Sequence, residues 1–171
     1  IGCFGYVNEN KRPFQTVSAV KNLLSSGYKV KLIFWGNSNI PDFEKKLKSS
    51  LQNSAFISGY LSSEEYACAL ELTDIVVNLR YPSMGESSGT LCEAYQYSKA
   101  VLVSDVNQYK EYPDEICWKV PVGKYEQECL TSMLKYLIDN PKVRKALGEN
   151  AYDYAKNVLS PSAIAKEYWK V

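Results

Sequence analysis

The sequence predicts a doubly wound α/β domain, in which a parallel sheet of about six strands carries helices on both faces and further helices follow at the C-terminus. Short apolar runs alternate along the chain with segments whose apolar residues recur at helical spacing. Strands that alternate with helices are joined by right-handed crossovers and therefore run parallel. The 171 residues contain no internal repeat and no long linker, so we expect one domain over residues 1–171.

The expected strands are short apolar runs that end at glycine or polar residues. The first opens the chain at Ile1–Val7, and the second, Val30–Trp35, ends before Gly36. The later strands are expected at Ala55–Ile57, Ile75–Leu79, Val101–Val103 and Ile116–Trp118.

The expected helices carry apolar residues three or four positions apart. Val17, Val20 and Leu23 mark the first helix, which Gly27 ends. A second contains Phe43, Leu47 and Leu51, a third begins at Ser62–Glu65, a fourth runs from Thr90 to Tyr97, and from Glu126 the chain is mostly helical, with Pro141 and Pro161 at helix starts.

Composition excludes several classes of function. Lysine and arginine number 20 against 19 acidic residues, and this balance argues against nucleic-acid partners. The chain has no histidine, which excludes a histidine-dependent triad or zinc site within it. The five cysteines form no C-x-x-C pair, and no apolar run reaches the roughly 20 residues of a membrane span. We therefore expect a cytoplasmic, reduced domain without a transmembrane segment or a metal.

Ligands of open parallel sheets bind at the carboxyl ends of the strands. The loop after the first strand runs from Gly5 to Lys11 and Arg12, two adjacent cations that could neutralise a phosphate or diphosphate. An ordinary solvated helix start explains the same pair, and from these residues alone it is the more economical interpretation.

Two further loops lie at the same expected edge. Ser87, Ser88 and Gly89 precede a helix, where their small side chains leave backbone N–H groups accessible to an anion. An ordinary Ser/Gly cap is the alternative. The segment Gly59–Ser62 is, from its residues alone, a plain turn into a capped helix.

The run Gly85–Ala94, followed by Ser98–Asp105 and Glu111, resembles the donor-domain signature of retaining GT-B glycosyltransferases, the glycosyl transferases of group 1. Gly5 with Lys11, Gly36 and Gly59 fall at the order and spacing of that family. The resemblance implies a Rossmann-like fold that forms one half of a GT-B enzyme. It also implies that the chain is a C-terminal domain that binds a nucleoside diphosphate sugar, and that an N-terminal acceptor domain is absent from this chain.

The resemblance also assigns roles to individual residues. Lys11, beside Gly5, would contact the donor diphosphate, with Arg12 as a helper. Glu86 is the implied catalytic residue, which would hydrogen-bond hydroxyls of the transferred sugar. The remaining implied donor contacts are the amides of Ser88, Gly89 and Thr90 at the distal phosphate, Glu93 at the ribose, and Gly59, Tyr60 and Leu61 beside the base.

The sequence departs from the family pattern at three places. Six residues separate Glu86 from Glu93 where the family has seven. Tyr6 stands where the family often has an arginine beside the lysine, and Arg80 or Arg12 could supply the missing cation. The family's G-x-P-V strand start lacks its proline, since Lys99-Ala100-Val101 stands in its place.

The expected activity is transfer of a sugar to an acceptor hydroxyl with retention of anomeric configuration. The acceptor, a saccharide or a lipid, would bind the absent domain, which could also hold the enzyme at a membrane surface. The chain contains no D-x-D motif, so we expect no metal or other cofactor. Two alternatives remain: a GT-B-type sugar-nucleotide epimerase, which would need further carboxylates and a histidine-bearing loop, and a non-catalytic flavodoxin-like binding module, which would not need Lys11, Glu86 and Glu93 at one cleft.

Overall fold

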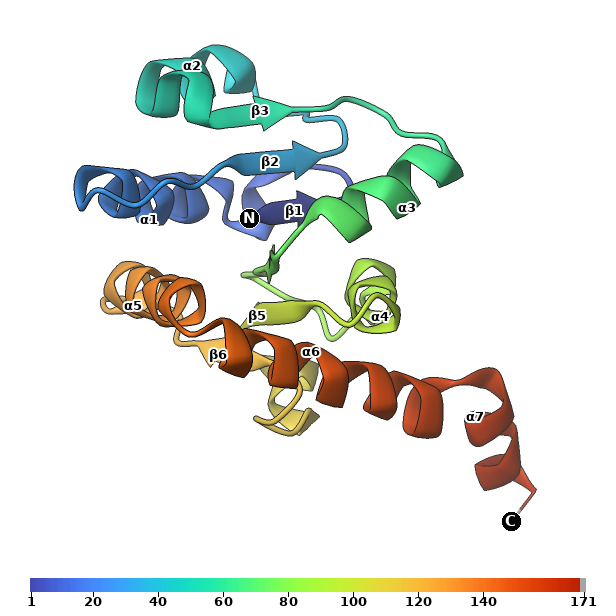
Figure 1. Cartoon of the computed structure of the whole chain (residues 1–171). Coiled ribbons are helices and arrows are strands. Elements are labelled where there is room, and N and C mark those ends of the chain that lie inside the picture. The colour runs from blue at the N-terminus through green and yellow to red at the C-terminus, as the bar shows by residue number, and fades with distance from the viewer. Residues whose placement is uncertain (170–171) are drawn as a thin grey trace.

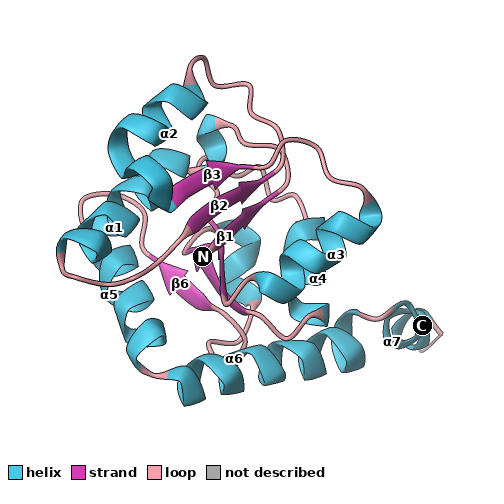
Figure 2. Cartoon of the chain, turned by 45° about the horizontal axis from the view of Figure 1, so that its top comes forward, coloured by secondary structure: helices cyan, strands magenta, loops and turns pink. Residues whose placement is uncertain are grey.

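The computed structural model describes residues 1–169, which form one six-stranded sheet with helices on both faces (Figures 1 and 2). The strand order is β3-β2-β1-β4-β5-β6, and every neighbouring pair is parallel. The strands are β1 (Gly2–Phe4), β2 (Leu32–Trp35), β3 (Ala55–Ile57), β4 (Ile75–Asn78), β5 (Ala100–Ser104) and β6 (Trp118–Val120). The predicted doubly wound α/β fold is confirmed.

The helices cover the two faces as separate layers. One layer contains α1 (Pro13–Ser25), α2 (Phe43–Leu51) and α5 (Glu126–Asp139), and the other contains α3 (Ser63–Leu72) and α4 (Gly89–Gln96). The helix α6 (Pro141–Tyr154) crosses between them, with Leu147 in the core of the first layer and Ala151 in that of the second (Figure 1). After α6 the chain continues through a π-helical turn, Ala155–Leu159, to α7 (Pro161–Tyr168), which projects from the body of the domain (Figure 1). No helix of the described residues has the length and apolar character that a membrane span requires.

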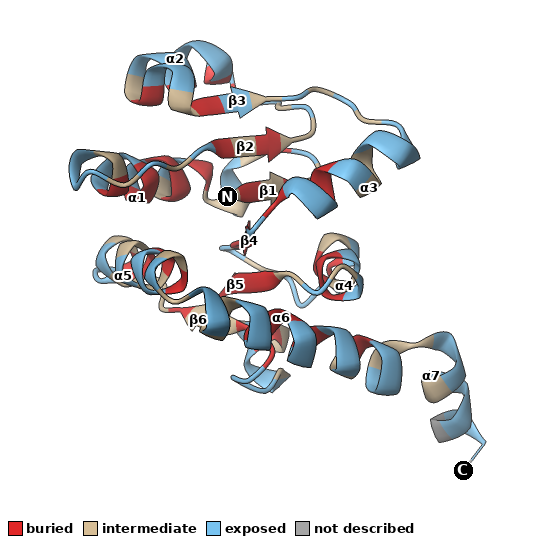
Figure 3. Cartoon of the chain, viewed as in Figure 1, coloured by how far each residue is buried: buried red, intermediate tan, exposed pale blue. Residues whose placement is uncertain are grey.

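The core lies between the sheet and these layers, so the strands are the most buried elements (Figure 3). All residues of β4 and β5 are buried. Leu130, Leu134 and Leu137 on α5 pack against them from one side, at the spacing the sequence predicted. On the other side Leu91 and Tyr95 of α4 fill the core. These two fully buried strands therefore hold the loops at their carboxyl ends in fixed positions.

The last strand begins two residues later than predicted. Residues 116 and 117 are buried, as their apolar character suggested, but the amide of Ile116 bonds to the carbonyl of Pro113 in a turn. Pairing with β5 begins at Trp118, opposite Leu102. Apolar character predicted burial correctly here, while the ladder starts only after the turn.

The loops at the carboxyl ends of β1 and β2 approach each other closely. The φ of Gly36 is 151°, and a Cβ atom there would lie 2.5 Å from the carbonyl oxygen of Gly5. Gly5 itself has a φ of 79°. Connections leave β1 toward β2 on one side, while β4 lies on its other side, so the strand order reverses at β1. Such a reversal opens a crevice at the carboxyl ends of the strands.

Candidate functional site

Lys11 lies in the connection that follows β1, at this edge of the sheet. It ends the short 3-10 turn Glu9–Lys11, which Asn8 caps by accepting a hydrogen bond from the Lys11 amide at 3.2 Å. The Lys11 Nζ donates to the carbonyl of Phe4 at 2.7 Å. A Cβ atom on Gly5 would lie 2.9 Å from this Nζ and 3.2 Å from the Thr90 Cγ2, so Gly5 brings the lysine next to the start of α4.

The ammonium of Lys11 is held in an unfavourable environment. Desolvation by burial, followed by repulsion from the Arg80 guanidinium, lowers the pKa of Lys11 to about 8. A charge that is half removed from water and lies near a second cation is stabilised by any anion that enters. This is the electrostatic character of an anion-binding site.

Arg12 points in a different direction from Lys11. Its backbone is left-handed, with a φ of 55°, and its guanidinium forms a two-pronged ion pair with Glu126 on α5, with Nε 2.9 Å from Oε1. Glu126 is only 3% exposed, and the guanidinium also lies 5.7 Å from the centre of the Tyr81 ring. This placement gives Arg12 a packing role between α1 and α5 and does not support the diphosphate contact predicted for it.

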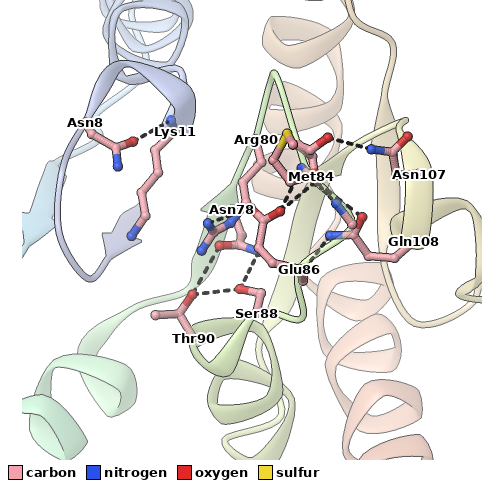
Figure 4. Close-up of polar contacts among 12 residues, drawn as sticks. Asn8, Lys11, Asn78, Arg80, Met84, Glu86, Ser88, Thr90, Asn107 and Gln108 are labelled. Carbon is pink, nitrogen blue, oxygen red and sulfur yellow. Dashed lines mark hydrogen bonds and ion pairs between the residues drawn. The ribbon is translucent and has the colours of Figure 1, made fainter.

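The N-terminus of α4 is organised by Asn78, the last residue of β4 (Figure 4). Its Nδ2 donates to the Ser88 Oγ at 3.2 Å, and its Oδ1 accepts from the Thr90 Oγ1 at 3.2 Å. Ser88 caps the helix, and its hydroxyl lies 3.0 Å from that of Thr90. The amides of Gly89 and Thr90 donate to no other described residue, so the helix start presents free N–H groups in its first turn.

Glu86 and Arg80 form an ion pair above this helix start, with Nη1 and Oε1 3.2 Å apart. The other carboxylate oxygen, Oε2, accepts from the Met84 amide at 2.8 Å and from the Ser83 hydroxyl at 3.3 Å. Backbone hydrogen bonds, from its own amide and that of Met84, are the main causes that lower the pKa of Glu86. The residue is exposed and ionised, and its carboxylate holds the loop after β4 in shape.

Arg80 is anchored from the neighbouring strand. Its amide donates to the Ser104 hydroxyl at the end of β5, at 2.9 Å. Its Nε is buried and has no hydrogen-bond partner among the described residues. Of the two arginines that could supply the missing cation beside Lys11, Arg80 is therefore the one whose charge Lys11 senses.

Two cavities continue from the helix start along the edge of the sheet. The larger, of about 490 Å³, is lined by residues of α3 and α4 that include Tyr66, Thr90 and Glu93. The smaller, of about 300 Å³, lies over the ends of β1 and β2 and is lined by Gly5, Tyr6, Trp35, Gly36, Asn37, Tyr60, Leu61 and Tyr66. Gly59 lines an adjacent hollow with Asn37.

The structure brings most of the predicted site residues to one edge. Lys11 and Thr90 meet beside Gly5, Thr90 and Glu93 line the larger cavity, and Tyr60 and Leu61 border the smaller one. Ser62 also caps α3 with a full capping box to Glu65, so the predicted turn into a capped helix is confirmed. Within the described part of the chain no group of three or more His, Cys, Asp or Glu residues could hold a metal ion.

Sequence reasoning missed two residues of this site. Asn78 had a detectable signal, because a polar side chain ends an otherwise apolar strand that is buried throughout. Tyr66 had none: it is one of 14 tyrosines, and its bond to Glu93 joins two helices that are adjacent only in the fold.

Residues 1–154 match the family described as Glycosyl transferases group 1. The match spans most of the chain, and the chain therefore belongs to this family and is a glycosyltransferase domain with the GT-B type of Rossmann-like fold. No curated protein matches the sequence significantly.

Solved structures share the fold at low sequence identity. The C-terminal domain of the group 1 glycosyl transferase LpcC from Francisella tularensis superposes with a TM-score of 0.79 at 20% identity, covering 94% of this chain and 85% of that one. Anabaena HepE in complex with UDP-glucose gives 0.78 at 16% identity, over 99% of this chain and 48% of that one. The pneumococcal O-GlcNAc transferase GtfA in complex with UDP and GlcNAc gives 0.80 at 12% identity, over 99% and 34%. This chain thus spans about half of HepE and a third of GtfA.

Proposed function

We propose that this domain is the donor-binding half of a retaining glycosyltransferase, and that an N-terminal domain carries the acceptor site for a saccharide or a lipid. The observation that carries the proposal is the position of Lys11. Its ammonium, which forms no ion pair with any described carboxylate, lies beside the N-terminus of α4, at the point where the strand order reverses. The complexes of HepE with UDP-glucose and of GtfA with UDP and GlcNAc support a nucleoside diphosphate sugar as the donor.

The chemistry asks the protein to stabilise a departing nucleoside diphosphate. As the bond from the anomeric carbon to the diphosphate breaks, negative charge grows on the distal phosphate. Lys11, Arg80 and the amides of Gly89 and Thr90 supply positive charge there, and fixed dipoles of this kind need no reorganisation during the reaction. We therefore propose that transfer is independent of a metal ion.

The other predicted residues would contact the ribose, the base and the transferred sugar of the donor. Glu93 would accept hydrogen bonds from the ribose, and Gly59, Tyr60 and Leu61 would border the base. Glu86, in the loop before α4, would orient the transferred sugar so that its anomeric carbon faces the acceptor. Retention of configuration is part of the proposal and rests on the family resemblance.

The first test is whether this 171-residue chain binds donors without transferring them. We expect calorimetric titration to detect binding of one or more of the UDP-, GDP- and ADP-sugars, because the diphosphate site lies within this chain. We expect no transfer at enzyme-like turnover, because the acceptor site lies in the other domain. Transfer at such turnover by this chain alone would contradict the proposal that the acceptor site lies in another domain. Binding of none of these donors would contradict the proposed donor site.

The second test uses the pKa of Lys11. The ammonium must be charged to attract the diphosphate, and its pKa in the ligand-free domain is about 8. Affinity for a UDP-, GDP- or ADP-sugar, whose diphosphate does not titrate in this range, should therefore be constant below pH 7 and fall as the pH rises through 8. Burial raises the pKa of the nearby Cys3 thiol to about 12, above this range. Lys11→Met should abolish the dependence. An unchanged pH profile in this variant would show that another group titrates.

A further inference from the structure

Tyr66 and Glu93 form a hydrogen-bonded pair where the two cavities meet. The Tyr66 hydroxyl, on α3, donates to the Glu93 Oε2, on α4, at 2.7 Å. Tyr66 and Leu61 line both cavities. A ligand that occupies both therefore contacts Tyr66, and its part in the larger cavity lies within reach of Glu93.

The tyrosine is held rigidly in this position. Its ring packs edge-on against Phe4 at the end of β1, with ring centres 5.3 Å apart, and Phe4 is buried in the core. Burial, and then the bond to Glu93, keep the pKa of Tyr66 above its usual range, so its hydroxyl remains a donor at neutral pH. A carboxylate has about four acceptor positions, so one bond from a fixed donor sets the orientation of Glu93 and leaves Oε1 for other hydroxyls.

The larger cavity also connects to the diphosphate position. Thr90 lines it, and the same residue stands beside Gly5 and Lys11. A nucleotide whose phosphates lie at Lys11 and whose base lies in the smaller cavity, beside Tyr60 and Leu61, places its pentose between them. The Tyr66–Glu93 pair faces that position.

We propose that Tyr66 is a positioning residue, which orients Glu93 to accept hydrogen bonds from the two neighbouring hydroxyls of a ribose. The domain then selects ribonucleoside diphosphate sugars over their 2′-deoxyribonucleoside counterparts. This inference rests on the proposed function of the site and deepens it, because it names the class of donor. A site built to bond a hydroxyl discriminates strongly against the analogue that lacks it, since its own polar groups then remain unpaired.

The experiment compares each ribonucleotide with its 2′-deoxy form. UDP, GDP and ADP, and 2′-deoxy-UDP, 2′-deoxy-GDP and 2′-deoxy-ADP, are titrated by calorimetry into the parent chain, Tyr66→Phe and Glu93→Gln. The matched control is Tyr97→Phe, because Tyr97 lines the same cavity but its hydroxyl makes no hydrogen bond to the Glu93 carboxylate among the described residues. Thermal unfolding of each variant checks that the fold is intact.

For the parent chain we expect the ribonucleotide to bind about tenfold more tightly than its deoxy form. Tyr66→Phe should reduce this ratio about threefold or more through weaker ribonucleotide binding, with deoxynucleotide affinity unchanged. Glu93→Gln should reduce it as well, and Tyr97→Phe should keep it. A ratio preserved in Tyr66→Phe, or an equal loss in Tyr97→Phe, overturns this inference alone. A ratio preserved in Glu93→Gln, or a parent ratio near one, overturns it together with the ribose contact proposed for Glu93, while the diphosphate site stands. Binding of none of the three ribonucleotides overturns the proposed function itself.

Discussion

Lys11→Met is expected to weaken nucleoside diphosphate binding tenfold or more while leaving binding of the free nucleoside almost unchanged. A charge-assisted contact to a phosphate contributes about 1.5–3 kcal/mol, which corresponds to about a tenfold to hundredfold change in the dissociation constant. Methionine keeps the length and apolar stem of the side chain, so the loss reports on the charge. Titration with UDP, GDP and ADP beside their nucleosides measures it.

The same substitution is expected to stabilise the ligand-free domain. The pKa of Lys11 is lowered from 10.5 to about 8 in the fold, so the unfolded chain binds more protons between these pH values. Stability contributed by this group therefore rises with pH through that window and is lowest when the lysine is charged. At pH 7, removal of the charge should raise the unfolding temperature by about 2–4 °C for each kcal/mol of desolvation relieved.

A matched control separates the two effects from general surface changes. Lys21 is an exposed lysine on α1, and Lys21→Met should alter neither diphosphate affinity nor the unfolding temperature appreciably. Equal diphosphate affinity in Lys11→Met and the parent chain would place Lys11 outside the site. A lower unfolding temperature would show that the bond from Lys11 to the Phe4 carbonyl outweighs the cost of the buried charge.

The sequence was sufficient to predict the fold because its layers depend on local patterns. Apolar spacing placed Leu130, Leu134 and Leu137 on one helix face, and all six strands were found within a few residues of their observed positions. The last strand shows the limit of this reasoning. An apolar residue such as Ile116 predicts burial, but it does not show whether the buried backbone belongs to a strand or, as here, to a turn.

The site was predicted less completely because its geometry depends on contacts between distant residues. Lys11 and Arg12 are adjacent in the sequence and have the same charge, yet only Arg12 meets a buried carboxylate, 114 residues away on α5. No local pattern separates the two cations. Likewise, the departure at Tyr6 left two candidate replacements, and only the fold brings Arg80 within electrostatic reach of Lys11.

Glu86→Gln is expected to lower turnover of the full-length transferase by an order of magnitude or more, with nucleoside diphosphate affinity nearly unchanged. The proposed sugar contact acts on the orientation of the anomeric carbon, and lost positioning of this kind reduces the rate of the chemical step. The nucleotide is held separately, by Lys11 and the first turn of α4. Glutamine keeps the shape of the side chain but removes its charge and one acceptor oxygen.

The hydrogen bonds that Glu86 makes in the ligand-free domain suggest an alternative role, which is to hold the loop after β4, and the experiment must distinguish this role from a sugar contact. Arg80, Ser83 and the Met84 amide donate to its carboxylate, and its own amide adds a further backbone interaction. The longest, from Ser83 at 3.3 Å, is the one that we expect a sugar hydroxyl to displace. If Glu86 served only to hold Arg80 and the loop, Glu86→Gln would weaken diphosphate binding, or lower the unfolding temperature, while turnover at saturating donor stayed the same.

Three measurements on one variant therefore distinguish these roles: turnover, diphosphate affinity and unfolding temperature. Glu128→Gln, at an exposed position on α5, is the matched control and should change none of them. Reduced turnover with intact diphosphate affinity supports a contact to the transferred sugar. Unchanged turnover would contradict that assignment and leave Glu86 as a residue that shapes the loop. In that case the unfolding temperature should fall only slightly, because a carboxylate that merely stabilises the adjacent helix start contributes about 0.3–1 kcal/mol of folding free energy.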